Sequence, residues 1–202
     1  MTHKVPKPFF VIATQNPIES EGVYQLPDAQ RDRFMMKILL TYPTPDEEMV
    51  ILDRMAVNPP QPEQIIDLAG LQSLQAAADV VFIDRTVQQY AVDLVQATRH
   101  PERAGMSDLS PMLALGASPR ATLALVRGAK SLAMLRGRTY ATPQDVFDIA
   151  PEVLRHRMVL TYDALARDVT VEHILHRLLS TVPATRVSPR TPAPSVQSVF
   201  ES

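Results

Sequence analysis

Three polar side chains lie at positions from which they could act on a phosphate group. The first, Asn16, follows the apolar run 9–14, which predicts a strand buried on both faces of a parallel sheet. Ligands of α/β proteins bind beyond the carboxyl ends of such strands, where an asparagine can orient a water molecule or a phosphate. The pair Asn16-Pro17 is also typical of turns, and on spacing alone a simple turn is the favoured interpretation.

The second candidate, Arg33, precedes another apolar run, 35–40, which predicts a second strand. Its planar guanidinium suits bidentate contacts with a phosphate. A local surface pair with Asp32, worth about 0–1 kcal/mol, explains the same residues without any ligand. The sequence taken alone favours the local pair.

The third candidate, Arg120, is predicted to lie in the first turn of a helix that Ser118 and Pro119 begin. A cation there faces the positive end of the helix dipole, at a cost of up to about 1 kcal/mol. That placement is explained if the side chain reaches an anion, since helix N-termini themselves bind phosphates. It is explained equally well if the side chain bends back to an acid or into solvent.

Other kinds of site find little support in the sequence. His173 and His176 have a spacing seen in metal sites, but they lie on an apolar helix without a nearby cluster of acids, so a structural role is favoured. The sequence contains no Gly-x-x-x-x-Gly-Lys-Ser/Thr loop to hold phosphates and no apolar strand that ends in Asp-Glu to hold magnesium. We therefore expect that this chain alone does not bind Mg-ATP tightly.

Composition excludes several classes of partner. The net charge of −2 over 202 residues argues against nucleic acid or an anionic membrane as a bulk partner. No apolar run approaches the roughly 18 residues of a membrane span. The absence of cysteine excludes disulfides and thiolate metal sites, and it fits a cytoplasmic protein.

The elements that would carry these residues change in type along the chain. The first 43 residues combine the two predicted strands with a short helix near 26–33, whereas the pattern from Thr44 onward is helical. Thr44, Thr142 and Thr170 each predict the start of a helix. Further helices are predicted near 67–78, 85–99 and 118–136, with a long loop over 100–117 and a disordered Pro-rich tail over 183–202.

Two blocks of sequence resemble the MoxR family of AAA+ ATPases. The first is Phe-Phe-Val-Ile-Ala-Thr-Gln-Asn-Pro-Ile-Glu at 9–19, followed by Glu-Gly at 21–22 and Leu-Pro-Asp-Ala-Gln-Arg-Asp-Arg-Phe at 26–34. The second is Gly-Ala-Ser-Pro-Arg-Ala at 116–121, with Tyr-Ala-Thr-Pro-Gln-Asp-Val at 140–146. The likeness covers about residues 5–182, and its first block is highly specific.

The resemblance implies an α/β remnant of an AAA+ αβα core followed by an all-α lid, predominantly helical overall. Residues 1–43 correspond to the C-terminal part of the nucleotide-binding core, and 44–182 to the helical lid region. In the family's sheet, the strand that carries the phosphate loop lies between the strands matching 9–14 and 35–40. We therefore expect both segments to lack ladder partners here and residues 1–43 to be poorly ordered.

The resemblance also assigns roles to the three candidate residues. Asn16 is similar to sensor 1, which positions the attacking water against the γ-phosphate. Arg33 resembles the arginine finger, which reaches ATP bound to the neighbouring protomer, and Arg120 resembles sensor 2, delivered by the lid to the same nucleotide. Arg31 stands where the family often has an apolar residue, so the finger is Arg33 or, as the second choice, Arg31.

A complete member of this family is expected to bind Mg-ATP between the protomers of a homo-oligomeric ring, here a hexamer. Hydrolysis would remodel or activate client complexes, which in this family often involve von Willebrand A-domain proteins. Because the family places Walker A and Walker B upstream of residue 9, we expect this chain to be a fragment that is inactive alone. The alternative is a non-catalytic helical protein-interaction module.

Overall fold

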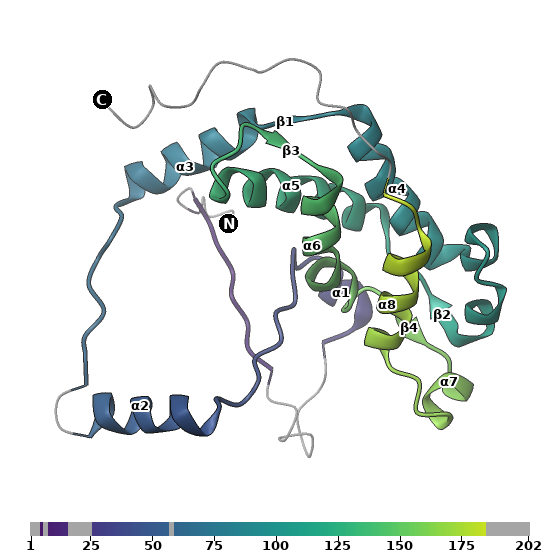
Figure 1. The fold of residues 1–202 in the computed structure, drawn as a ribbon, viewed down its shortest axis with the longest axis horizontal. Helices are drawn as coiled ribbons and strands as arrows, with labels where there is room; N and C mark the ends of the chain where they lie inside the picture. Colours follow the sequence, from purple (N-terminus) through teal and green to yellow (C-terminus); the bar gives the residue numbers. More distant parts are fainter. Residues whose placement is uncertain (1–4, 6–7, 16–25, 57–58, 185–202) are drawn as a thin grey trace, which may run out of the picture.

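The computed structural model describes residues 5, 8–15, 26–56 and 59–184. Four helices pack together as a bundle in the C-terminal two thirds of the chain (Figure 1). They are α4 (Arg85–Arg99), α5 (Pro119–Leu135), α6 (Pro143–Leu154) and α8 (Val171–Thr181). Each follows a residue that caps its first turn, as the sequence predicts for α5, α6 and α8.

The core of the bundle is built from apolar residues at helical spacing on the facing sides of these helices. In α4 the buried positions Val87, Tyr90, Ala91, Leu94 and Val95 recur every three or four residues, which places them on one face. The buried residues of α5 are mostly alanine and glycine. This small face allows the close approach of α6, whose side chains fill the space that larger residues on α5 would need.

Shorter elements connect and cover the bundle. A long loop was expected over 100–117, but this region contains two 3-10 helices and a strand. Gly105, between the two 3-10 helices, has the left-handed φ of 78° that the chain reversal requires. The remaining elements are α1 (Asp28–Arg31), α2 (Pro45–Met55), α3 (Leu68–Val80), β1 (Phe82–Ile83), η1 (Pro101–Ala104), η2 (Ser107–Met112), β2 (Leu113–Leu115), β3 (Tyr140–Ala141), β4 (Val159–Leu160) and α7 (Tyr162–Ala166).

The strands form two small pairs that close the ends of the bundle. β1 and β3 run parallel with Phe82 opposite Tyr140, and β2 and β4 run antiparallel with an irregularity between Leu113 and Leu115. Within the described residues these are the only ladders. The two pairs join helix ends and do not form a sheet that could carry a nucleotide.

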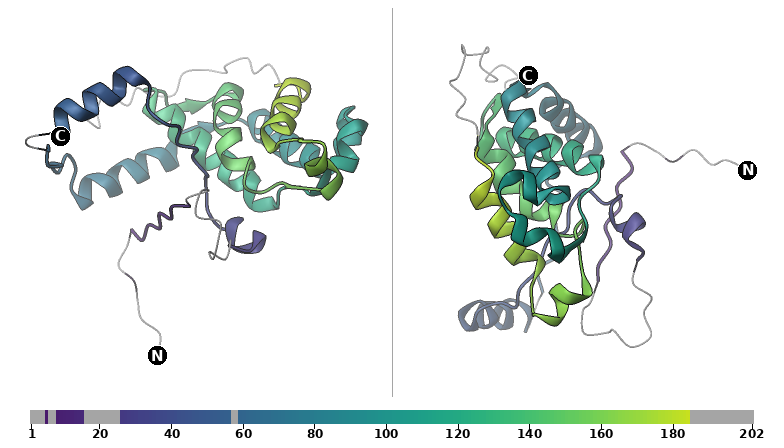
Figure 2. Two further views of the ribbon diagram at one scale, coloured as in Figure 1. Left: turned by 90° about the horizontal axis from the view of Figure 1, so that it is seen from below. Right: turned by 90° about the vertical axis from the view of Figure 1, so that its right-hand side faces the viewer.

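The α2 helix lies apart from the bundle, between two extended segments (Figures 1 and 2). Its start is the predicted capping box: the Thr44 amide donates to Glu47 Oε2 at 2.8 Å, and the Glu47 amide donates to Thr44 Oγ1 at 3.4 Å. None of its residues is buried. Local capping and propensity therefore define this helix, without support from packing.

The strands predicted at 9–14 and 35–40 are absent from the described structure. Both segments are extended without a ladder, and large apolar side chains such as Phe10 and Leu40 are 81% and 92% exposed. A strand is defined by ladder hydrogen bonds to a neighbouring strand, and neither run forms a ladder with another described segment. The prediction of strand was wrong here, whereas the expectation of lost ladder partners agrees with the structure.

A buried carboxylate fixes the start of α6 and the end of α5. Asp145 Oδ2 accepts hydrogen bonds from the Thr142 amide and hydroxyl, both at 2.8 Å, and from Arg138 Nη1 at 2.8 Å. Its Oδ1 accepts from Arg136 Nη1 at 2.9 Å. Burial alone would raise the pKa of Asp145, but the bonds from Arg138 and Thr142 outweigh it and lower the pKa to about 2.

We predict that Asp145→Asn lowers the free energy of unfolding by about 1–3 kcal/mol, because an amide group cannot accept from all of these donors. Urea denaturation of the 202-residue chain followed by circular dichroism measures this. Asp148→Asn is the control, since Asp148 forms an ion pair with Arg136 at 2.6 Å but is partly exposed, and its loss should be smaller. Equal losses of unfolding free energy in the two variants would show that the buried bonds of Asp145 contribute no more to stability than the partly exposed ion pair of Asp148.

Candidate functional site

Of the three predicted site residues, the structure describes the two arginines. Asn16 lies outside the described residues. Arg33 and Arg120 come from distant parts of the sequence, one from the turn after α1 and the other from the first turn of α5. The structure brings these two elements together through Asp32.

The turn that carries Arg33 begins where α1 ends, at Asp32. The Arg33 side chain is exposed. The local Asp32–Arg33 pair suggested by the sequence does not form among the described residues, because the Asp32 carboxylate pairs with Arg120 and Arg157 of the helical bundle. Arg31, the second candidate for the finger, instead pairs with Asp28 within α1. Arg33 is therefore the one of the two without a described partner for its guanidinium.

A buried guanidinium from the helical bundle binds this turn. The Arg157 side chain, which follows the end of α6, is only 2% exposed. Its Nε donates to Asp32 Oδ1 at 3.1 Å, and its Nη2 donates to the carbonyls of Asp32, at 3.2 Å, and of Phe34. Its Nη1 donates to the carbonyl of Met35 at 3.1 Å. One side chain thus binds the main-chain carbonyls of three residues on the two sides of Arg33.

The neighbours of Arg157 extend this attachment along the chain. His156 Nε2 lies 3.1 Å from the carbonyl of Phe34, which requires that this nitrogen carries the proton. The Lys37 amide donates to the carbonyl of Glu152 at 2.8 Å, and Arg155 Nη1 donates to the carbonyl of Lys37 at 2.8 Å. The segment 32–37 is therefore bound to the C-terminal end of α6 by main-chain and side-chain bonds.

The first turn of α5 contacts the same carboxylate. The Ser118 hydroxyl lies 2.9 and 2.8 Å from the two Asp32 oxygens and accepts from the Arg120 amide at 3.2 Å. Arg120 Nη1 lies 3.5 Å from Asp32 Oδ2, while the side chain stays 56% exposed. The side chain does bend towards an acid, as one of the two interpretations predicts. It stays accessible enough for a bound anion to compete for it.

A close contact with α4 fixes the loop before α5. The Ala117 amide donates to Thr98 Oγ1 at 2.9 Å, and Arg99 Nε donates to the Ala117 carbonyl at 2.6 Å. A Cβ atom on Gly116 would lie 2.5 Å from the Thr98 carbonyl oxygen, so only glycine fits at this position. The Gly-Ala-Ser-Pro-Arg motif thus places Arg120 at a defined point relative to the bundle.

The electrostatics of this junction favour an anionic ligand. Arg120 and Arg157 share the single carboxylate of Asp32, and the side chain of Arg33, the next residue in the chain, has no ion pair among the described residues, so positive charge exceeds negative charge among these four residues. Burial lowers the pKa of Arg157, and the charge of Asp32 opposes this. Burial and the charge of Arg157 lower the pKa of His156 to about 4, so it stays neutral at pH 7 and adds no charge.

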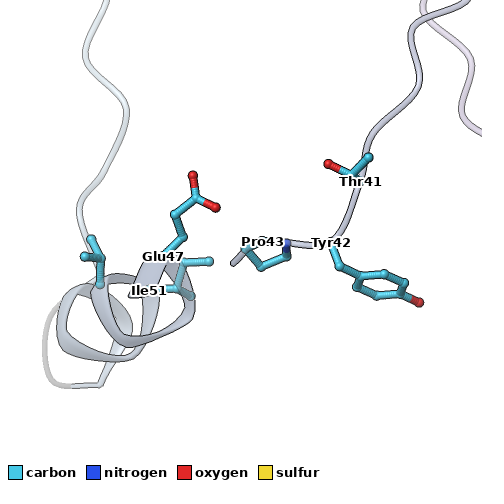
Figure 3. Close-up of a pocket in the computed structure, with 6 residues that line it drawn as sticks. Thr41, Tyr42, Pro43, Glu47 and Ile51 are labelled. Carbon is cyan, nitrogen blue, oxygen red and sulfur yellow. The ribbon is translucent and has the colours of Figure 1, made fainter. Parts of the chain in front are cut away.

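The described residues offer little for other chemistry. No three metal-binding side chains come together within them. None of their helices is both long and apolar enough to cross a membrane. A shallow hollow lies between α2 and the segment 41–43, where the Tyr42 ring points away from the helix (Figure 3). Its one charged group, Glu47, is already bonded in the capping box, so the hollow is a gap beside an isolated helix.

Comparison with known proteins gives this geometry a family context. Residues 1–36 match the ATPase family associated with various cellular activities (AAA), and residues 106–178 match the AAA lid domain. The chain is 51% identical over 187 residues to the chaperone MoxR1 of Mycobacterium tuberculosis, covering 93% of this chain and 50% of that protein. The chain belongs to the MoxR-type AAA+ family.

Other relatives of this MoxR-type chain agree. It is 37% identical to YeaC of Bacillus subtilis, over 90% of this chain and 54% of that protein, and 32% identical to protein MoxR of Paracoccus denitrificans, over 86% and 55%. A crystal structure from Cytophaga hutchinsonii superposes with a TM-score of 0.87 at 36% identity, covering 92% of this chain and 57% of the other. The chain thus spans about half the length of the relatives that it matches.

Sequence reasoning missed two residues of the junction. The sequence suggests Asp32 only as a local partner of Arg33, and nothing in the local pattern marks Arg157 beyond a cation near the C-terminal end of a helix, where a cation is favourable. The bond between them joins residues 125 positions apart, and no local pattern signals such a contact. The only local signal is the run Arg-His-Arg at 155–157, which places more basic residues together than are needed to complement the dipole at a helix end.

We predict that the MoxR-type chain loses stability as the pH falls from 6.5 towards 4. In this range the unfolded chain protonates His156 at its ordinary pKa of 6.5, whereas the folded chain, in which the pKa is about 4, does not. Folding therefore becomes less favourable on acidification, and the effect levels off near pH 4. Urea midpoints measured at pH 7, 5.5 and 4.5 follow this change.

His156→Gln should remove most of this pH dependence, because glutamine can still donate to the Phe34 carbonyl but does not titrate. His173→Gln, a change at an exposed position on α8, serves as the matched control and should leave the slope as it is. A parallel loss of slope in both variants would contradict a specific contribution from His156.

Proposed function

We propose that this chain supplies the phosphate-sensing arginines and the lid of a MoxR-type ATPase. In this proposal residues 1–43 belong to the nucleotide-binding core and 44–182 form the helical lid region. Asn16 acts as sensor 1, Arg33 as the finger and Arg120 as sensor 2. The observation that supports it most is the Asp32 carboxylate, which joins the turn of Arg33 to the helix start of Arg120.

The exposed arginines suit the charge that develops during phosphoryl transfer. Mg-ATP, when bound by the complete protein, supplies the transferable γ-phosphoryl group and a metal that neutralises its charge. Arg33 donates hydrogen bonds to that group from a turn that the lid holds in place. Arg120 exchanges its weak contact with Asp32 for a phosphate oxygen, and the N-terminal end of α5 adds a favourable dipole. Asn16 orients the attacking water.

The assembly and its clients follow from the same proposal. A finger acts on the nucleotide of a neighbouring protomer, so the complete protein is proposed to work as a homo-oligomeric ring, a hexamer, in the cytoplasm. Hydrolysis would remodel or activate client complexes, including von Willebrand A-domain proteins. One relative, the chaperone MoxR1, carries a name of this general kind.

We predict that Arg33→Ala in the complete protein lowers the rate of ATP hydrolysis roughly 10³-fold or more, the usual effect of a lost arginine finger. ATP binding by each protomer should be nearly unchanged, because a finger contacts the nucleotide of its neighbour. Arg31→Ala is the matched control, and its effect should be small because Arg31 pairs with Asp28 inside α1. Lost ATP binding with normal ring assembly would contradict the role of Arg33.

A second prediction concerns the 202-residue chain itself. Isothermal calorimetry with Mg-ATP should detect no tight binding, because its sequence contains neither a phosphate loop nor magnesium-binding acids. Tight binding would show that the nucleotide is held in a way that this proposal does not include.

The alternative, a helical interaction module, makes a different prediction for the complete protein. If rings that carry Arg33→Ala or Arg120→Ala lack ATPase activity but still bind and act on the client as before, the interaction module is favoured.

A further inference from the structure

We propose that Arg157 and Asp32 are positioning residues for Arg33, so that the lid sets the direction of the finger within its own protomer. This inference rests on the proposed role of Arg33 as the finger. Arg157 and Asp32 do not themselves contact the nucleotide or a neighbouring protomer in this proposal, since Arg157 is buried and Asp32 is directed at the lid.

The main-chain bonds carry the first step of the argument. Arg157 donates to the carbonyls of Asp32 and Phe34, the residues immediately before and after Arg33. The Asp32 carbonyl belongs to the peptide plane just before Arg33, and the Phe34 amide, in the plane just after Arg33, donates to the Arg31 carbonyl at 3.1 Å. With the Phe34 carbonyl also bound by Arg157, the main chain is held on both sides of Arg33, which limits the directions in which its Cα–Cβ bond can leave the turn. The Arg33 side chain itself stays exposed and free of bonds to other described residues.

The choice of residue type is the second step. Burying a guanidinium is unfavourable unless the group is paired and fully hydrogen-bonded, and an apolar residue of similar size would attach the turn to the lid more simply. An apolar residue would not, however, direct any bond at the main chain. Arg157 offers a rigid fork of five N–H donors, and its bonds to Asp32, Phe34 and Met35 use that fork.

The second attachment is the third step. Asp32 also accepts from Ser118, the residue that caps α5, and lies beside Arg120. The turn of Arg33 is thus bound to two separate elements of the lid, the C-terminal end of α6 and the N-terminal end of α5. A shift of the lid would therefore move Arg33 and Arg120 together, as one unit.

The test uses Arg157→Lys, which keeps the charge but cannot bind the three carbonyl groups as a fork. In the complete protein, kcat should fall on the order of 10- to 100-fold, the effect of a misplaced catalytic group. The dissociation constant for ATP and the ring assembly should stay within about twofold of the unaltered protein, because the buried Arg157 contacts neither the nucleotide nor a neighbouring protomer and only the placement of Arg33 changes. Arg138→Lys, which alters a similarly bonded arginine at the remote Asp145 site, is the control and should keep kcat.

Double variants separate positioning from a general structural role. If Arg157 acts through Arg33, then Arg157→Lys added to Arg33→Ala lowers kcat no further. An additional, multiplicative loss in the double variant would overturn the proposal. Asp32→Asn also alters the contacts of Ser118 and Arg120, so its loss of kcat should become smaller in the Arg33→Ala background without disappearing.

Hydrogen exchange on the 202-residue chain adds a readout that does not depend on ATP. Arg157→Lys should speed amide exchange over 32–37, while the exchange of α4 stays the same. Unchanged exchange over 32–37 would overturn the inference, even if Arg33 proves to be the finger. If Arg33→Ala leaves hydrolysis intact, the proposed function fails, and the positioning role fails with it. Faster exchange over 32–37 in Arg157→Lys, found together with intact hydrolysis in Arg33→Ala, shows that the proposed function has failed although Arg157 does hold the turn.

Discussion

A guanidinium removed from water must find partners for its charge and for each of its N–H groups, and Arg157 finds most of them in one short turn. Its partners include the carboxylate of Asp32 and the main-chain carbonyls around Arg33. Because the cost of leaving such a group unpaired is high, the turn and the end of α6 form a single packed unit. The placement of Arg33 depends on this unit, and Arg120 contacts the same carboxylate from α5.

The same constraint explains how an exposed and flexible type of side chain can be part of a defined site. Arg33 and Arg120 each have long side chains with several rotatable bonds, and neither is buried. What the fold fixes is the main chain from which they project, through Gly116 against α4 and through Asp32 against the lid. A ligand then has only side-chain rotamers to order, which lowers the entropic cost of binding.

Local features of the sequence were sufficient to predict most helices. Thr44, Thr142 and Thr170 each begin a helix as expected, because capping depends on residues within three positions of each other. The α4 helix follows the predicted range 85–99, as its apolar spacing indicates. The pairs of short strands were not predicted, since such pairs between distant segments leave no periodic pattern to detect.

The errors have a common physical cause. The runs 9–14 and 35–40 have the composition of buried strands, but a strand needs a neighbour, and composition does not show whether one is present. The pairing of Asp32 with Arg157 was missed for the related reason that local spacing says nothing about partners far along the chain. The family likeness, and not spacing, is what led to the prediction that Arg33 and Arg120 act on a nucleotide.

The distance along the chain between Asp32 and Arg157 also bears on the order of folding. Helices such as α4 and α5 depend on near neighbours and can form early, whereas this contact closes a loop that contains almost the whole bundle. During synthesis the N-terminal turn leaves the ribosome well before its partner has been made. The turn therefore docks last, onto a bundle that is already built, and the bundle serves as its template.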